Sequence, residues 1–227
     1  MNLPNTLSLI RICMIPLIVA MFIVNCFWGT IVAIVLFILA AFTDFLDGYI
    51  ARKYNMVTDL GKLLDPIADK VLITAVLFLI CAFNPYDYRL GLEGVTEQDL
   101  ALHVFSMVFF SCGSIIVVAR ELLISAVRQI AASKGVVVQA NIFGKIKTVL
   151  QDITLPIIML MRYLAALVWM NKATPEILKA TDLIGIIGLV LFGIMVLVTL
   201  LSGVIYLVQN RFVFAENKQP TAESSAN

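Results

Sequence analysis

Four aspartates in a short stretch are the side chains of this sequence best suited to chemistry. Asp44 and Asp47 lie in the segment DFLDGYIAR, and Asp65 and Asp69 lie in LLDPIADK. At about 100° per residue, each pair falls on one face of its own helix. A short turn between the two helices would bring the two pairs of carboxylates together.

Four neighbouring carboxylates repel one another, and they cannot all ionise in low-dielectric surroundings without cations. Oxygen ligands suit a hard divalent ion, and Mg²⁺ usually shares its ligand shell with substrate phosphates. We therefore expect Asp44, Asp47, Asp65 and Asp69 to bind Mg²⁺ or Mn²⁺, as two ions. A merely acidic loop does not explain the spacing, which directs the acids toward one another.

The helix face that carries Asp44 and Asp47 also carries Gly48, which has no side chain, and Ala51, which has a small one. Together they leave room for a flat base and a ribose. Arg52 follows and can reach a phosphate. No Ser–His or Cys–His pair lies near these residues to act as a nucleophile. The expected chemistry is direct displacement at phosphorus, with metal ions neutralising the developing charge.

The composition places these acids in a membrane protein. Of the 227 residues, 61% are hydrophobic and 14% are charged, against about 25% charged in soluble domains. A net charge of +1 argues against nucleic-acid binding through a basic face. The four cysteines lie in apolar runs without CxxC pairing, so we expect small core hydrophobes rather than disulfides or zinc ligands. They are Cys13, Cys26, Cys81 and Cys112.

Long apolar runs predict an all-α integral membrane protein with six transmembrane helices, in one domain over residues 1–210 and with a polar tail over 211–227. The region from Asn84 to Asp99 is expected to be a polar loop, and Asn171 to Ala180 a second one. The expected helices run approximately over 7–26, 28–53, 61–83, 102–133, 144–170 and 183–208.

The positions of charges along these helices predict where the site lies. The run from Trp28 to Thr43 has 16 residues without a charge, about 24 Å of helix against a hydrocarbon core of about 30 Å. The aspartates therefore lie near one membrane face. Val104 to Ala119 is another uncharged run of 16 residues in a helix of the same direction, so Arg120 should lie at the depth of Asp44.

The distribution of Lys and Arg predicts the orientation. Twelve of them fall on the face that holds both termini and the aspartates, and four fall on the other. The positive-inside rule then makes the first face cytoplasmic, with the active site on that side.

Four basic residues near the same face could bind a phosphate on a second substrate: Arg120, Arg128, Lys145 and Lys147. A cation at this depth that faced lipid would be costly, which favours a phosphate-bearing acceptor for Arg120. Two alternatives stay open. The cations could be ordinary positive-inside anchors, the interpretation we prefer for Lys134, or Glu121 and Asp152 could neutralise them in structural ion pairs.

The pattern D-x2-D-G-x2-A-R-x8-G-x3-D-x3-D is complete here, and it resembles the signature of the CDP-alcohol phosphatidyltransferases. Its fixed positions are Asp44, Asp47, Gly48, Ala51, Arg52, Gly61, Asp65 and Asp69. The resemblance implies CDP-diacylglycerol as donor and CMP as leaving group. It also implies metal ligation by Asp44, Asp47 and Asp65.

The same resemblance implies further roles. Asp69 would be a metal ligand that also takes the proton from the attacking hydroxyl, while Gly48, Arg52 and Thr58 would contact the cytidine diphosphate. The entry segment PNTLS is similar to one that helps to bind the nucleotide in this family. Asn5 and Ser8 are thus either donor-binding residues or helix caps.

The segments VVAREL and GKIKT, and a tail reading SGVIY, resemble those of the phosphatidylglycerophosphate synthases within this family. This implies transfer of the phosphatidyl group to glycerol 3-phosphate by a homodimer in the bacterial cytoplasmic membrane. For Asn84 to Asp99 we find no match.

Two other functions stay open. The same chemistry could use another acceptor, such as inositol phosphate, serine or a phospholipid. Membrane acids can also mark an ion or proton transporter, but such acids usually lie near the midplane on broken helices, often within inverted repeats.

Overall fold

The structure is a computed structural model, and it describes the backbone of residues 3–24, 27–53, 59–91, 94–134, 142–170 and 174–211. Within these ranges, side chains are described except at positions 3–5, 27, 45–53, 59–60, 62–63, 65, 91 and 169. All statements below about side chains concern the described ones.

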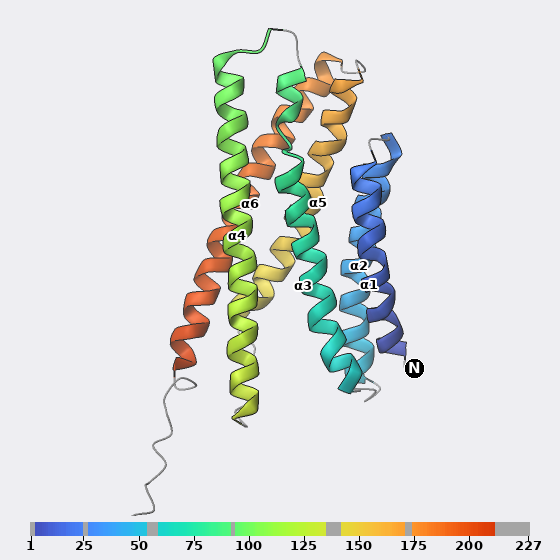
Figure 1. Cartoon of the computed structure of the whole chain (residues 1–227), viewed down its shortest axis with the longest axis vertical. Coiled ribbons are helices and arrows are strands. Elements are labelled where there is room, and N and C mark those ends of the chain that lie inside the picture. The colour runs from blue at the N-terminus through green and yellow to red at the C-terminus, as the bar shows by residue number, and fades with distance from the viewer. Residues whose placement is uncertain are drawn as a thin grey trace, which may run out of the picture.

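The described chain is helical throughout and contains no strand. Six long helices are described, and Figure 1 shows them along the length of the molecule, with α1, α3 and α5 running one way and α2, α4 and α6 the other. The start of α1 and the end of α6 therefore lie toward the same end, the lower one in Figure 1. The elements are α1 (Leu3–Ile23), α2 (Phe27–Lys53), α3 (Asp59–Ala82), the short 3₁₀ helix η1 (Asp87–Gly91), α4 (Glu97–Ser133), α5 (Ile142–Trp169) and α6 (Pro175–Gln209).

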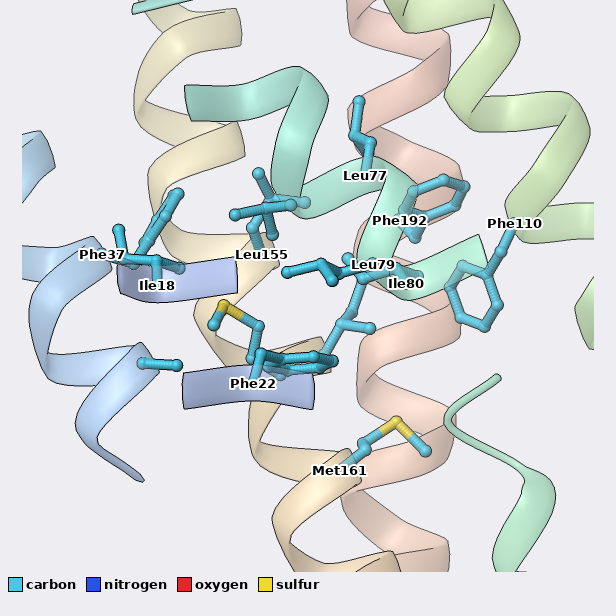
Figure 2. Close-up of a cluster of buried hydrophobic side chains, with 14 of the residues drawn as sticks. Ile18, Phe22, Phe37, Leu77, Leu79, Ile80, Phe110, Leu155, Met161 and Phe192 are labelled. Atoms are coloured by element: carbon cyan, nitrogen blue, oxygen red, sulfur yellow. The ribbon is translucent and has the colours of Figure 1, made fainter. Parts of the chain in front are cut away.

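The six helices form a closed ring around one apolar core. Helix α1 packs on α2 and α3, α2 packs on α5, α5 on α6, α6 on α4, and α4 on α3. Figure 2 shows side chains from all six helices meeting inside this ring. Those labelled there are buried: Ile18, Phe22, Phe37, Leu77, Leu79, Ile80, Phe110, Leu155, Met161 and Phe192.

A glycine sets the spacing between α4 and α6. A β-carbon on Gly113 would lie 2.4 Å from Cε1 of Phe192, so only a residue without a side chain lets the Phe192 ring pack at this point. The exposed large apolar residues include Phe78 and Ile115, which are 72% and 68% exposed. Apolar side chains on the outside suit a protein surrounded by lipid tails, where helices associate through close packing at small residues.

Five helices contain segments long and apolar enough to cross a membrane: Thr6–Ile23, Pro66–Leu90, Glu97–Ser133, Ile142–Val168 and Pro175–Gln209. The apolar part of α2, Trp28–Asp44, is shorter. The prediction of an all-α membrane protein is thus confirmed in its class. The six-span count stays a prediction.

The two expected loops are shorter in the structure than predicted, because a helix begins inside each of them. Helix α6 begins at Pro175, so residues 175–180 are helical rather than part of the expected loop over 171–180. Thr174 caps this helix by accepting a hydrogen bond from the backbone N–H of Ile177. Helix α4 begins at Glu97, behind a capping box in which Thr96 and Asp99 each satisfy the other's backbone N–H. Capping side chains extended both helices into polar sequence.

The region from Asn84 to Asp99 is also not a simple loop, because it contains η1 and a polar network. The guanidinium of Arg89 donates to Oδ1 of Asp99 at 2.7 Å and to Oδ1 of Asp182 at 2.6 Å. Asn84 is buried and donates to the hydroxyl of Ser106 at 3.0 Å. These contacts join η1 to α4 and α6 at the end of the bundle opposite the one that carries the predicted site.

Cys13, Cys81 and Cys112 are free, but they are not the core residues expected from the sequence: Cys13 and Cys112 are exposed and Cys81 is half-buried. Cys26 lies outside the described residues. His103 also belongs to this polar network, with its Nδ1 3.2 Å from Oδ1 of Asp87.

Candidate active site

A cavity of about 580 Å³ opens among five helices at the end of the bundle where α1 begins. Its walls come from α2, the first half of α3, the second half of α4, the start of α5 and the end of α6. Among the described side chains, five basic and three acidic ones line it: Lys70, Arg120, Arg128, Lys145 and Lys147, and Asp44, Asp69 and Glu121. The described basic residues suit anionic ligands.

Two of the four predicted metal ligands line this cavity. Asp44 reaches it from α2 and Asp69 from α3, and the two carboxylates lie within electrostatic range of each other. Asp152 on α5 lies within electrostatic range of both. The side chains of Asp47 and Asp65 lie outside the described residues.

Arg11 holds the carboxylate of Asp44. Its Nη1 lies 2.6 Å from Oδ1 of Asp44, and the Arg11 side chain is fully buried whereas that of Asp44 is 41% exposed. A buried guanidinium with one oxygen of Asp44 in contact leaves the exposed side of that carboxylate available to a ligand. Arg11 therefore fixes the orientation of Asp44 toward the cavity.

All four basic residues predicted for the acceptor line the same cavity as Asp44 and Asp69: Arg120, Arg128, Lys145 and Lys147. Arg120 and Asp44 were expected at one depth because each follows 16 uncharged residues in helices of the same direction. Their presence in one cavity agrees with that expectation.

Two of these cations do form ion pairs with Glu121. Glu121 accepts from Nη1 of Arg120 at 3.1 Å and from Nζ of Lys147 at 2.6 Å through the same oxygen, Oε1. One carboxylate shared by two cations leaves net positive charge. Arg128 and Lys145 have no ion-pair partner within the described part of the chain.

The end of helix α6, which carries the SGVIY segment, forms a wall of the cavity. Nη2 of Arg120 donates to the hydroxyl of Ser202 at 2.8 Å. A β-carbon on Gly203 would lie 3.0 Å from Cγ of Arg120, so the bare backbone there gives the arginine stem its place. Tyr206 lies one turn further on and also lines the cavity.

Most of the residues predicted to bind the donor lie outside the residues that the structure describes. The side chains of Asn5, Gly48, Ala51 and Arg52 and the whole of Thr58 lie outside the described residues. Ser8 is fully buried and does not line the charged cavity. Because α1 begins at Leu3, Ser8 lies inside the helix and does not act as its N-cap.

The described side chains at this site fit a hard divalent cation in part. Asp44 and Asp69 supply oxygen ligands from two helices to one cavity, which is the donor type that Mg²⁺ and Mn²⁺ prefer. Among the described residues no group of three or more His, Cys, Asp or Glu could hold a metal ion, and the remaining predicted ligands, Asp47 and Asp65, are not among them.

Arg11, Ser202 and Tyr206 were missed as site residues. Arg11 carried a usable signal, because a charged residue inside an apolar span is commonly functional and paired. Ser202 and Tyr206 lie in the SGVIY segment, whose resemblance to the family was noted without a role for either residue. Their role depends on the packing of α6 against α4.

The fold and this cavity define a helical membrane protein that brings acidic and basic side chains together at one end of its bundle. A model of the family described as CDP-alcohol phosphatidyltransferase matches residues 1–191. The chain belongs to the CDP-alcohol phosphatidyltransferase family.

Individual relatives agree with this membership. The chain is 37% identical over 159 residues to a CDP-diacylglycerol–glycerol-3-phosphate 3-phosphatidyltransferase of Rickettsia bellii, covering 70% of this chain and 75% of that protein. It is 36% identical over 171 residues to the Bacillus subtilis protein of that name, covering 70% and 77%. A cardiolipin synthase (CMP-forming) of Oryza sativa is 34% identical over 166 residues, covering 71% of this chain and 46% of that protein.

Proposed function

We propose that this protein transfers the phosphatidyl group of CDP-diacylglycerol to glycerol 3-phosphate, giving phosphatidylglycerophosphate and CMP. One observation carries the proposal: a single cavity is lined both by Asp44 and Asp69 of the family motif and by the basic residues of the VVAREL and GKIKT segments. The relatives from Rickettsia bellii and Bacillus subtilis carry the name of this reaction.

The acidic wall binds the donor. Asp44, Asp47, Asp65 and Asp69 are the residues that would hold Mg²⁺ or Mn²⁺, as two ions, and the bound metal would neutralise the charge of the pyrophosphate. Arg11 keeps the Asp44 carboxylate turned toward the cavity. The donor's cytidine diphosphate contacts Gly48, Ala51, Arg52 and Thr58, with Asn5 at the entry segment, whereas Ser8 is buried inside α1 and does not line the charged cavity.

The basic wall binds the acceptor. Arg120, Arg128, Lys145 and Lys147 attract the phosphate of glycerol 3-phosphate, and a guanidinium can bind two phosphate oxygens at once. Asp69 takes the proton from the attacking hydroxyl, which then forms the new bond to phosphorus as the bond to CMP breaks. Asp69 lines the same cavity as Asp44 and as the basic residues proposed for the acceptor, which supports its role as the base.

A second, apolar cavity supports a lipid donor. Its volume is about 650 Å³, and Lys70 lines both this cavity and the charged one. The apolar cavity follows α3 from Lys70 to Phe83, with Val19 and Ile23 of α1 on one side. A lipid could thus place its phosphates in the charged cavity and an acyl chain along α3.

The arrangement in the membrane is part of the proposal. All six helices span the bilayer, with α2 the shortest span, and the charged cavity opens on the cytoplasmic side together with both termini. The membrane is the bacterial cytoplasmic membrane, and the protein works as a homodimer. The excess of Lys and Arg near the cavity supports this orientation.

An acceptor panel tests the reaction. Purified protein receives CDP-diacylglycerol, a divalent metal and one labelled acceptor at a time: glycerol 3-phosphate, inositol phosphate, serine or phosphatidylglycerol. We expect labelled phosphatidylglycerophosphate from the first and no newly formed labelled lipid from the others. Cardiolipin from phosphatidylglycerol would instead favour the activity named for the rice relative, and no lipid product with any acceptor would contradict phosphatidyl transfer.

Replacement of Arg11 tests the support of Asp44. We expect Arg11→Gln to raise the concentration of Mg²⁺ or Mn²⁺ needed for half-maximal activity by about 10–100-fold, the usual effect of removing a residue that orients a metal ligand. Titration of activity with each metal measures this. Arg89→Gln, at the other end of the bundle, is the control, and its metal dependence should stay normal. An unchanged metal dependence in Arg11→Gln would show that Asp44 needs no such support.

A further inference from the structure

Lys70 is the residue at which the charged cavity meets the apolar cavity, because it lines both of them. Its ammonium group makes no ion pair or hydrogen bond within the described part of the chain. Beyond Lys70, the apolar cavity continues along α3 to Phe83. A lipid with its phosphates in the charged cavity therefore passes Lys70 before its acyl chain enters the apolar one.

Thr74 brings a hydroxyl group into the apolar cavity. Among the described side chains that line this cavity, Lys70 and Thr74 are the two polar ones. Thr74 comes four residues after Lys70, so it lies on the same face of α3 and about 6 Å further along the helix. Phe78 comes four residues later and also lines the cavity. An ammonium group, a hydroxyl group and an aromatic ring thus follow one another along one face of α3.

The hydroxyl of Thr74 is available to a ligand. A threonine inside a helix can donate to a carbonyl of the preceding turn, as Thr181 does to Ile177 at 2.8 Å. Thr74 makes no hydrogen bond of this or any other kind to the described residues. A hydroxyl group in apolar surroundings is unfavourable unless it finds a hydrogen-bond partner. The apolar cavity therefore offers a hydrogen-bond donor to a ligand that carries an acceptor.

The order of these groups along α3 matches the order of groups in a diacylglycerol phosphate. In such a lipid the phosphate is followed by the three-carbon glycerol backbone, then by the ester carbonyls and then by the acyl chains. A phosphate beside Lys70 and an acyl chain beside Phe78 place an ester carbonyl at the level of Thr74. A dialkyl ether lipid has no carbonyl at this position.

We propose that Thr74 is a specificity residue for the donor, its hydroxyl donating a hydrogen bond to an ester carbonyl, so that the protein prefers a diacyl lipid to a dialkyl ether lipid. This inference rests on the proposed function, because it takes a CDP-linked lipid to occupy both cavities. It assigns to α3 the recognition of the ester linkage, apart from the recognition of the pyrophosphate.

Equilibrium binding of CDP-diacylglycerol and of a CDP-dialkylglycerol with chains of equal length tests this, with Mg²⁺ present and no acceptor. We expect the wild type to bind the diacyl lipid about two- to tenfold more tightly, the contribution of one neutral hydrogen bond. Thr74→Val keeps the shape of the side chain without the hydroxyl. It should lose affinity for the diacyl lipid by that factor and keep its affinity for the ether. Thr74→Ser keeps the hydroxyl and should keep the preference.

Thr181→Val is the matched control. It removes a hydroxyl that donates within α6 near the start of that helix, away from both cavities, so its ester preference should equal that of the wild type. Equal affinities of the wild type for the two lipids, an equal fall for both in Thr74→Val, or loss of the preference in Thr74→Ser would each overturn the proposal.

The two proposals fail in different ways in this assay. Because no acceptor is present, the result does not depend on whether glycerol 3-phosphate is the acceptor. Binding of both lipids without a preference concerns Thr74 alone. No binding of either CDP-linked lipid would overturn the proposed function and this inference with it.

Discussion

Asp69→Asn is expected to lower turnover by about 10²–10⁴-fold, the range that general bases contribute. Asparagine keeps the shape of the side chain but can neither take the proton of the attacking hydroxyl nor supply a negative charge to a metal ion. Because Asp44 still lines the cavity, binding of CDP-diacylglycerol should survive in part. Single-turnover kinetics and equilibrium binding of the nucleotide lipid measure the two effects separately.

Asp182→Asn is the control for this experiment. Asp182 accepts hydrogen bonds from Tyr88 and Arg89 at the other end of the bundle, so its loss should affect stability and leave the chemical step intact. Near-normal turnover of Asp69→Asn would remove Asp69 as the base, whatever happens to donor binding.

Arg120→Ala is expected to raise the KM for glycerol 3-phosphate by about 10–100-fold and the KM for CDP-diacylglycerol far less. The estimate follows from the contribution of about 1.5–3 kcal/mol that hydrogen bonds to charged groups make. The Arg120 side chain is 12% exposed and held by Glu121 and Ser202, so it is already placed for an incoming phosphate. Steady-state kinetics with each substrate varied in turn measure the split.

Arg120→Lys helps to separate binding from structure. Lysine keeps the charge but loses the planar fork that binds two oxygens, so its KM for glycerol 3-phosphate should fall between those of wild type and Arg120→Ala. Lys179→Ala, on an exposed side chain at the start of α6, should change neither KM. An equal effect of Arg120→Ala on both substrates would instead make Arg120 a structural partner of Glu121.

The sequence predicted the helices and the common level of Asp44 and Arg120 because both depend on local composition. Uncharged runs of 16 residues before Asp44 and before Arg120 were enough to place these two residues at one level. The closed ring of helices then brings them into one cavity. The starts of α4 and α6 were predicted too late in the sequence. The polar residues after Thr96 and Thr174 indicated a loop, but each threonine caps a helix that begins directly after it.

The sequence could not predict contacts that depend on which helices pack together. The pairing of Arg11 with Asp44 requires α1 to lie against α2, and the contact of Arg120 with Ser202 requires α6 to lie against α4. Glu121 was one of two candidates to neutralise the cations, and only the packing of α5 on its neighbours places Lys147 at its carboxylate. The packing of the helices determines which side chains lie opposite a given residue. This packing leaves no pattern in the sequence of a single helix.

The most direct test of the account is the release of CMP from CDP-diacylglycerol in the presence and absence of a chelator. With glycerol 3-phosphate present, we expect CMP release that requires Mg²⁺ or Mn²⁺, stops in excess chelator and returns when the metal is restored. Full CMP release in excess chelator would contradict the claim that these aspartates bind the metal ions that hold the pyrophosphate.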